Sequence, residues 1–276
     1  IPVLSFHKCG GNVGDTVNIP IPNFIFSYDR KPYFVDRFNQ IDDEYISFAY
    51  DFVKIGDRTP LEMYRDFMLN FCQHYQEYLS TNTIIEIEVG LGPCGELRYP
   101  SYLLSRWSYP ACGTFQCYDE QFKKIFERDA SAAGHTEWTS LPDDTGDSYN
   151  VYPGGCSFWN DGYKSEYGKF FQEWYAQQLI DHGSNVLRIA REVFLNTRIS
   201  AKISGIHWQF MTESRCAEST AGFYNSNGHD GYNEIVKMFK KHNADVCFTC
   251  LEMTGQDGGA KSDPGALVYK ILQVTK

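Results

Sequence analysis

The chain has 276 residues, a formal net charge of −10 and an aromatic content of 16%. This length allows one large domain or two small ones. The negative charge argues against nucleic acid and anionic membrane surfaces as partners. The sequence also lacks an apolar run of about 18 residues, the length that would indicate a membrane-spanning helix. A neutral polysaccharide is compatible with this charge, and aromatic side chains suit such a ligand as stacking platforms.

The N-terminal segment predicts a short strand followed by a glycine-rich loop. Residues 2–6 are the strand candidate, and His7 leads into a loop that carries three glycines and Asp15. The loop lacks the Lys-Ser or Lys-Thr ending of a phosphate-binding loop, so a lid over a neutral ligand is favoured. No signal peptide is expected, because the first residues lack a basic region, an apolar run and a cleavage site.

A helix is predicted over residues 59–80, after an aromatic and proline-containing stretch, residues 16–57, in which no clear period is visible. Thr59 is a suitable N-cap and Glu62 completes a capping box. Apolar residues then follow at helical spacing. The stretch before the helix is interpreted as a long excursion over the strand ends.

Residues 84–89 alternate in polarity and predict a strand, with Glu86 and Glu88 on the face opposite to the apolar residues. In a barrel these two glutamates point inward, as structural ion-pair partners or as part of the site. A loop that carries Glu96 follows the strand directly. Loops after the strands of α/β enzymes hold acid–base chemistry, although a surface glutamate in a turn is the alternative.

The rest of the chain alternates between predicted helices and strands, which indicates parallel β/α units. A strand at 201–208 has Lys202 and His207 near its two ends, and a last strand with its loop spans 244–253 and contains Thr249. Residues 136–164 are interpreted as a long loop. Helices are expected at 118–132, 166–181 (ended by Gly183), 184–195, 232–242 and 265–273.

The nine cysteines are odd in number and lack the compact spacing of a disulfide framework. Reduced thiols in an intracellular setting, cytoplasmic or plastid, are the simplest interpretation. Cys247 and Cys250 form one pair spaced two residues apart, without a second pair at zinc spacing. No metal and no cofactor are therefore expected.

Two motifs resemble the signatures of the β-amylases, inverting hydrolases that release maltose from α-1,4-glucans. One is Gly-Pro-Cys-Gly-Glu-Leu-Arg-Tyr-Pro-Ser-Tyr at 92–102, and the other is His-Lys-Cys-Gly-Gly-Asn-Val-Gly-Asp at 7–15. Cys94 stands where the family usually has alanine or serine. The resemblance implies that Glu96 is the general acid, and that its partners are α-1,4-glucan and maltose.

The resemblance also implies which residues contact the sugar. His7, Asp15, Lys202, His207 and Thr249 match the family's substrate-binding positions. Because a general acid must hold its proton near neutral pH, Arg98 is expected to point away from Glu96.

The fold implied is α/β, part of a (β/α)8 TIM barrel with long loops at the C-terminal ends of its parallel strands. Only four of eight strands are found, so residues 1–276 are interpreted as one incomplete barrel domain from the middle of the family's catalytic domain. The Gly-Glu-Asn segment of the family's general base is absent, although Glu252, on a loop after a strand, is an alternative base. The chain alone is therefore expected to be inactive, and a non-catalytic glucan-binding or regulatory protein remains the alternative function.

Overall fold

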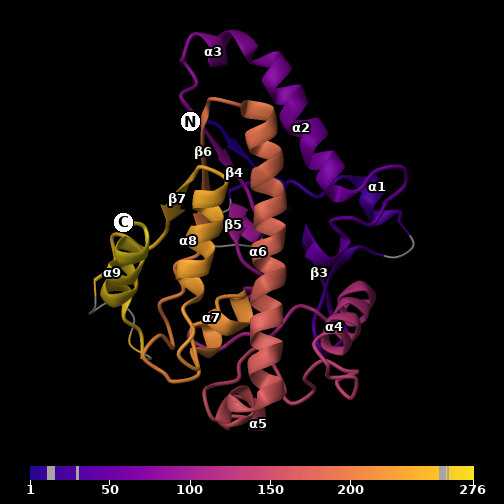
Figure 1. The fold of residues 1–276 in the computed structure, drawn as a ribbon, viewed down its shortest axis with the longest axis vertical. Helices are drawn as coiled ribbons and strands as arrows, with labels where there is room; N and C mark the ends of the chain where they lie inside the picture. Colours follow the sequence, from indigo (N-terminus) through magenta and orange to yellow (C-terminus); the bar gives the residue numbers. More distant parts are fainter. Residues whose placement is uncertain (11–15, 29–30, 255–258, 260) are drawn as a thin grey trace.

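The computed structural model describes residues 1–10, 16–28, 31–254, 259 and 261–276. Its centre is a five-stranded parallel sheet (Figure 1). In this sheet β1 pairs with β4, and each of β4, β5 and β7 pairs with β6. The strands are β1 (Val3–Leu4), β4 (Glu86–Val89), β5 (Glu96–Leu97), β6 (Arg198–Ile203) and β7 (Ala244–Phe248). The predicted parallel β/α arrangement is confirmed, with β6 starting and ending earlier than expected.

The sheet register brings the C-terminal ends of the strands together. β4 pairs with the first half of β6, and β5 pairs with its second half, where Glu96 lies opposite Lys202. β5 therefore continues the line of β4 after the intervening loop. Among the described strands, β1 pairs only with β4 and β7 only with β6, so the sheet is a curled half-barrel that is open at both edges.

The helix after the predicted capping box is confirmed. Thr59 accepts a hydrogen bond from the Glu62 amide, and the Glu62 carboxylate accepts one from the Thr59 amide. The helix α2 (Pro60–His74) and the short α3 (Gln76–Ser80) divide the predicted span between them. α4 (Glu120–Ala132) likewise begins at a capping side chain, because Asp119 accepts from two backbone amides of its first turn.

The long helix α6 (Glu166–Phe194) contradicts the prediction of two helices separated at Gly183. Gly183 is buried within α6, where a Cβ would lie 2.9 Å from side-chain atoms of both Leu97 and Met238. The glycine therefore permits close packing of α6 on β5 and α8, and does not end the helix. In Figure 1, α6 crosses the molecule between α2 and α8.

The C-terminal third supplies α7 (Cys216–Ala221), α8 (Gly231–Lys241) and α9 (Pro264–Val274). α8 packs against α6, β7 and α9. The predicted helices near 232–242 and 265–273 are thus confirmed within one or two residues at each end. Short helical turns complete the chain, namely α1 (Asn23–Phe26), η1 (Phe48–Tyr50), η2 (Pro93–Gly95), α5 (Ser157–Asn160) and η3 (Gly162–Lys164).

A hairpin lies inside the stretch for which the sequence predicted no regular element. β2 (Tyr33–Val35) and β3 (Ile41–Ile46) form an antiparallel pair. The carbonyl oxygen of Glu44 in β3 accepts from the amide of Lys8 at 2.7 Å. The hairpin therefore sits beside the C-terminal end of β1, next to the site. The prediction failed because β2 has three residues, too few to show a period.

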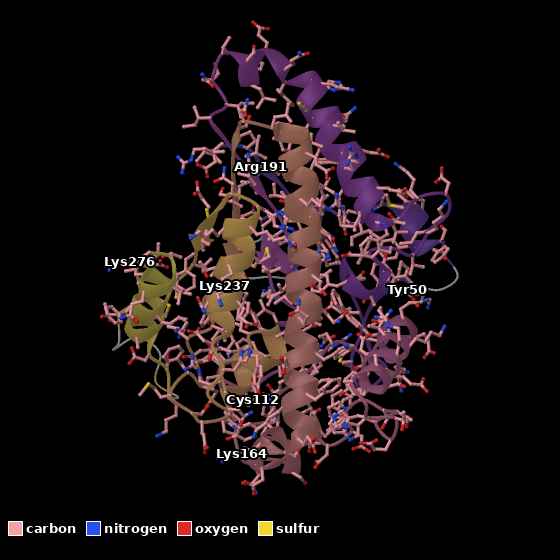
Figure 2. The ribbon with its side chains drawn as sticks, in the orientation of Figure 1. Tyr50, Cys112, Lys164, Arg191, Lys237 and Lys276 are labelled. Carbon is pink, nitrogen blue, oxygen red and sulfur yellow. A yellow bond between two sulfur atoms is a disulfide. The ribbon has the colours of Figure 1, made fainter. Side chains whose placement is uncertain are left out.

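Two cysteines far apart in the sequence are joined, contrary to the expectation of reduced thiols. Cys112 and Cys216 form a disulfide across a sequence separation of 104 residues (Figure 2). Both side chains are almost completely buried. The pairing could not be foreseen because the two residues meet only through the tertiary fold; the other described cysteines are free.

Candidate active site

Glu96 follows a tight loop that joins β4 to β5. A Cβ at Gly92 would lie 2.6 Å from the carbonyl oxygen of Glu96, so the backbone can approach this closely only at a glycine. Cys94 adopts the left-handed conformation, with φ of 55°. This turn returns the chain to the sheet, and β5 then places Glu96 opposite Lys202. Two predicted site residues therefore share the C-terminal end of the sheet.

Arg98 donates from Nε to Glu96 Oε2 at 2.8 Å, so the prediction that its side chain points away is wrong. The Arg98 side chain is 3% exposed, and a buried cation needs acceptors. Glu96, the Tyr99 carbonyl and the Cys94 sulfur provide them, and the Tyr102 ring lies 4.3 Å from the guanidinium.

Lys202 forms an ion pair with Glu88, with Nζ 2.8 Å from Oε1. Glu86, two residues earlier on β4, accepts from the Ser200 hydroxyl at 2.6 Å and also faces β6. Glu86 therefore fits the first interpretation left open by the sequence, a structural partner of β6, whereas Glu88 borders the site through Lys202. Lys202 is one-third exposed, so the pair lies at the surface of the site beside Glu96.

Glu44 of β3 is a member of the site that sequence reasoning missed. It is 5% exposed, and the Cys94 thiol lies 3.7 Å from its Oε1. Burial raises the pKa of the Cys94 thiol to about 12, so the sulfur is a neutral bridge between Glu44 and Arg98. The only available signal was an acidic run at 42–44, whose position depended on a hairpin that was not predicted.

A group of four aromatic residues forms a wall near the end of β6. We call it the aromatic wall, and its members are Tyr102, Trp107, Tyr109 and Trp208, whose neighbouring ring centroids are 5.2–6.2 Å apart. Both indole N–H groups donate to the carbonyl oxygen of Ala111. Tyr109 is nearly half exposed. Because Trp208 is buried, the exposed Tyr109 is the member that offers a ring of the kind that stacks on sugars, which the aromatic content suggested without identifying the residue.

His207 and Thr249 lie on the segments that follow β6 and β7. The His207 ring is within 6.2 Å of Tyr109 in the aromatic wall, and its Nδ1 is 2.7 Å from the Ser262 hydroxyl. Thr249 Oγ1 accepts from the Gly205 amide at 2.7 Å. This bond ties the loop after β7 to the loop after β6. Both predicted residues therefore lie at the same end of the sheet as Glu96.

His7 follows β1 and reaches the Glu96 loop, since a Cβ on Gly95 would lie 3.9 Å from its Cε1. It also borders a mostly apolar hollow of about 320 Å³ next to α1 and α2. Asp15, the other predicted residue of this loop, lies outside the described residues. The structure thus brings five predicted residues to one end of the sheet, and these are His7, Glu96, Lys202, His207 and Thr249.

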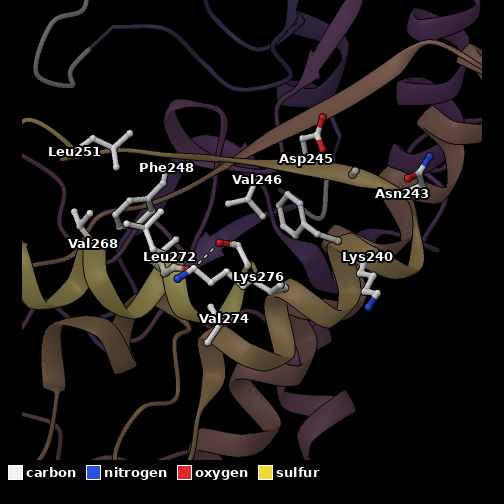
Figure 3. A pocket seen from close by; sticks show the side chains of 15 residues that line it. Lys240, Asn243, Asp245, Val246, Phe248, Leu251, Val268, Leu272, Val274 and Lys276 are labelled. Atoms are coloured by element: carbon white, nitrogen blue, oxygen red, sulfur yellow. Dashed lines mark hydrogen bonds between the residues drawn. The ribbon is translucent and has the colours of Figure 1, made fainter.

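A larger hollow of about 550 Å³ lies elsewhere, between β7, α8 and α9 (Figure 3). Its walls are mainly apolar and include Val246, Phe248 and Leu272. It contains none of the predicted site residues and lies at the open edge of the sheet. Within the described part of the chain, no three His, Cys, Asp or Glu side chains are placed to hold a metal ion, and no helix is long and apolar enough to cross a membrane.

Comparison with known proteins decides the family. The family model described as Glycosyl hydrolase family 14 matches residues 1–276. The chain belongs to glycosyl hydrolase family 14. It is 45% identical over 282 residues to "Beta-amylase 2, chloroplastic" of Arabidopsis thaliana and 44% identical over 281 residues to the beta-amylase of Glycine max, covering 98% of this chain in each case.

Family 14 membership also accounts for the half-barrel. The catalytic domain of beta-amylase from Paenibacillus polymyxa superposes with a TM-score of 0.80 at 32% identity, covering 99% of this chain and 66% of that one. The chain spans about half the length of its curated relatives, 52% and 56% for the two named above. The resemblance to β-amylases and the partial barrel are therefore both confirmed.

Proposed function

We propose that this family 14 chain is part of a β-amylase that cleaves α-1,4-glucosidic bonds of starch-like glucans from the non-reducing end and releases β-maltose. Residues 1–276 form one domain, an incomplete catalytic barrel. The observation that carries the proposal is the position of Glu96, a largely buried carboxylate at the C-terminal end of parallel strands, where barrel enzymes hold their chemistry.

Glu96 acts as the general acid and protonates the oxygen that leaves as the glucosidic bond breaks. In the free structure Arg98 holds its carboxylate at 2.8 Å. A glucan that covers the site excludes water from Glu96 and from the leaving oxygen.

The sugar hydroxyls are held by residues around Glu96. Lys202 donates from its ammonium group, and His207 and Thr249 contribute from the two loops tied together at Gly205. His7 approaches from β1, and Asp15, which lies outside the described residues, is assigned by the family resemblance. The partners of the protein are thus α-1,4-glucan and maltose, and the exposed ring of the aromatic wall stacks on the glucan.

Inversion also requires a general base, a second carboxylate roughly 6.5–9.5 Å from the acid that activates water on the opposite face of the sugar. We assign no described carboxylate to this role, because the Gly-Glu-Asn segment that carries the family's base does not occur in this sequence. The family 14 base is expected from sequence outside the 276 residues. The chain by itself should then release no maltose from starch.

Substitution of Glu96 by glutamine in the intact protein tests the proposal. Glu96→Gln keeps the shape of the side chain and removes the proton donor. Starch binding should therefore persist, while maltose release falls by about 10²–10⁴-fold. Glu127→Gln, an exposed glutamate on α4, is the matched control and should retain full activity. Maltose release within tenfold of wild type would remove Glu96 from the acid role.

A non-catalytic glucan-binding or regulatory protein is the second candidate, favoured by the direct Arg98–Glu96 ion pair. The same assay separates the two, because a binding protein would show glucan affinity without maltose release before any substitution. For localisation, we propose a cytoplasmic or plastid setting, which is supported by the chloroplastic relative. The buried Cys112–Cys216 disulfide is an argument for a more oxidising compartment.

A further inference from the structure

The Arg98 guanidinium lies beside two carboxylates, and the proposed mechanism uses only one of them. Its Nε donates to Glu96 at 2.8 Å. At its Nη2, the Cys94 sulfur lies 3.4 Å away, and the same sulfur is 3.7 Å from Oε1 of Glu44. One sulfur atom therefore separates the guanidinium from the carboxylate of Glu44.

The β2–β3 hairpin holds Glu44 at this position. The residue is 5% exposed and lies in β3. Its amide donates to Oδ1 of Asp42 at 2.8 Å, and its carbonyl oxygen accepts from the amide of Lys8 at 2.7 Å. Because both backbone groups are bonded, the backbone that carries the Glu44 side chain is anchored beside the Glu96 loop.

Charge balance gives Glu44 a use in the reaction. Glu96 must carry a proton when the glucosidic bond breaks, and in that state it supplies no negative charge to Arg98. The Arg98 side chain is 3% exposed, and a buried cation without a counter-charge is costly. Burial lowers the pKa of Arg98, but nearby groups, led by Tyr102 and including Glu44, raise it overall. Glu44 therefore remains as a counter-charge when Glu96 is protonated.

We propose that Glu44 is a positioning residue that acts through Arg98, because its charge compensates the guanidinium while Glu96 holds the proton for the leaving oxygen. This inference rests on the proposed function, since it concerns the same general acid. The Cys94 thiol adds no charge of its own, because burial raises its pKa to about 12. Glu44 and Glu96 are thus the two carboxylates that share one buried cation.

Other ionisable groups face these two carboxylates from several elements. Lys202 of β6 lies opposite Glu96 in the sheet and pairs with Glu88 of β4. The remaining groups are His7 and Lys8 after β1, Asp42 and Asp43 on β3, Tyr102 and Arg106 after β5, and Cys250 after β7. All of them are retained in the test variants, so a difference in pH dependence reports the charge of Glu44.

The pH dependence of starch hydrolysis by the intact protein tests the inference. Glu44→Gln keeps the size of the side chain and removes its charge, so protonation of Glu96 becomes less favourable beside Arg98. The alkaline limb of the pH profile should therefore move to lower pH by about one unit. Hydrolysis of α-maltosyl fluoride should stay at the wild-type rate, because fluoride leaves without needing a proton.

Two further variants separate charge from shape. Glu44→Asp keeps the carboxylate and should return the alkaline limb to its wild-type position. Glu127→Gln, at an exposed glutamate on α4, is the control and should leave the profile unchanged.

The outcomes separate this inference from the proposed function. An unshifted alkaline limb in Glu44→Gln, or an equal shift in Glu44→Asp, would overturn the role of Glu44 and leave Glu96 as the acid. Equal losses on starch and on α-maltosyl fluoride, or a Glu44→Gln protein without a cooperative melt, would assign Glu44 to the fold and would also overturn the inference. A folded wild-type protein that hydrolyses starch at no pH would overturn both.

Discussion

The disulfide between Cys112 and Cys216 should contribute strongly to stability. It closes a loop of about 100 residues, since its sequence separation is 104. By reducing the entropy of the unfolded chain, a cross-link over such a loop should raise the free energy of unfolding by about 4.7 kcal/mol. A body of 276 residues unfolds with an entropy of about 0.6 kcal/mol/K near its midpoint. Reduction, or the double substitution Cys112→Ser and Cys216→Ser, should therefore lower the melting temperature by about 8 °C.

The assay compares thermal melts with and without a strong reductant and identifies the cross-linked peptide by mass spectrometry under non-reducing conditions. Cys72→Ser, at a free and partly exposed cysteine, is the matched control and should melt as wild type does. Equal melting temperatures with and without reductant, together with free Cys112 and Cys216 thiols in the unreduced protein, would refute the reasoning.

The same disulfide should matter for the site. Ala111, whose carbonyl accepts from Trp107 and Trp208, directly precedes Cys112. The carbonyl of Cys112 itself accepts from the Thr220 hydroxyl at 2.6 Å. Loss of the cross-link should therefore loosen the aromatic wall and increase the mobility of its tryptophans, a change that tryptophan fluorescence measures.

Two further predictions concern buried charges. Burial and Glu44 raise the pKa of Asp42 from 3.8 to about 7 on folding. The folded state therefore binds more protons, and the free energy of unfolding should fall as pH rises from about 4 to 7, with a contribution from Asp42 on the order of 4 kcal/mol. Because burial also raises the pKa of Asp119 to about 6, Asp42→Asn should reduce this decline in urea melts without abolishing it, and an unchanged decline would count against the reasoning. His182 Nδ1 lies 2.9 Å from both carboxylate oxygens of Asp51 in the core. His182→Ala should therefore lower the free energy of unfolding by about 3–5 kcal/mol. His74→Ala, at an exposed histidine, is the control and should leave the free energy of unfolding almost unchanged.

Some features of the site were predictable because they depend on local sequence. The glycines before Glu96 permit a tight turn that needs no information from elsewhere in the chain, and the capping box at Thr59 is a four-residue signal. Lys202 was assigned to the site by the family resemblance alone, because the predicted strand 201–208 put it at the N-terminal end, whereas β6 ends at Ile203 and puts it near the C-terminal end. The turn and the capping box follow from short-range chemistry.

Other features depended on contacts between distant segments. Gly183 has the local signal of a helix end, yet its lack of a Cβ serves packing against Leu97 and Met238. Arg98 was expected to avoid Glu96, but its burial, visible only in three dimensions, requires the carboxylate as partner. The Cys112–Cys216 disulfide has the same origin, since no spacing rule joins residues 104 positions apart.

The central claim is that Glu96 donates a proton to the leaving oxygen of an α-1,4-glucan. Hydrolysis of α-maltosyl fluoride by the intact protein tests it most directly, because fluoride leaves without needing a proton while the sugar contacts stay the same. Glu96→Gln should lose maltose release from starch by at least about 100-fold and retain most of its activity on the fluoride. Equal losses on both substrates would contradict the acid role, and so would full activity on starch.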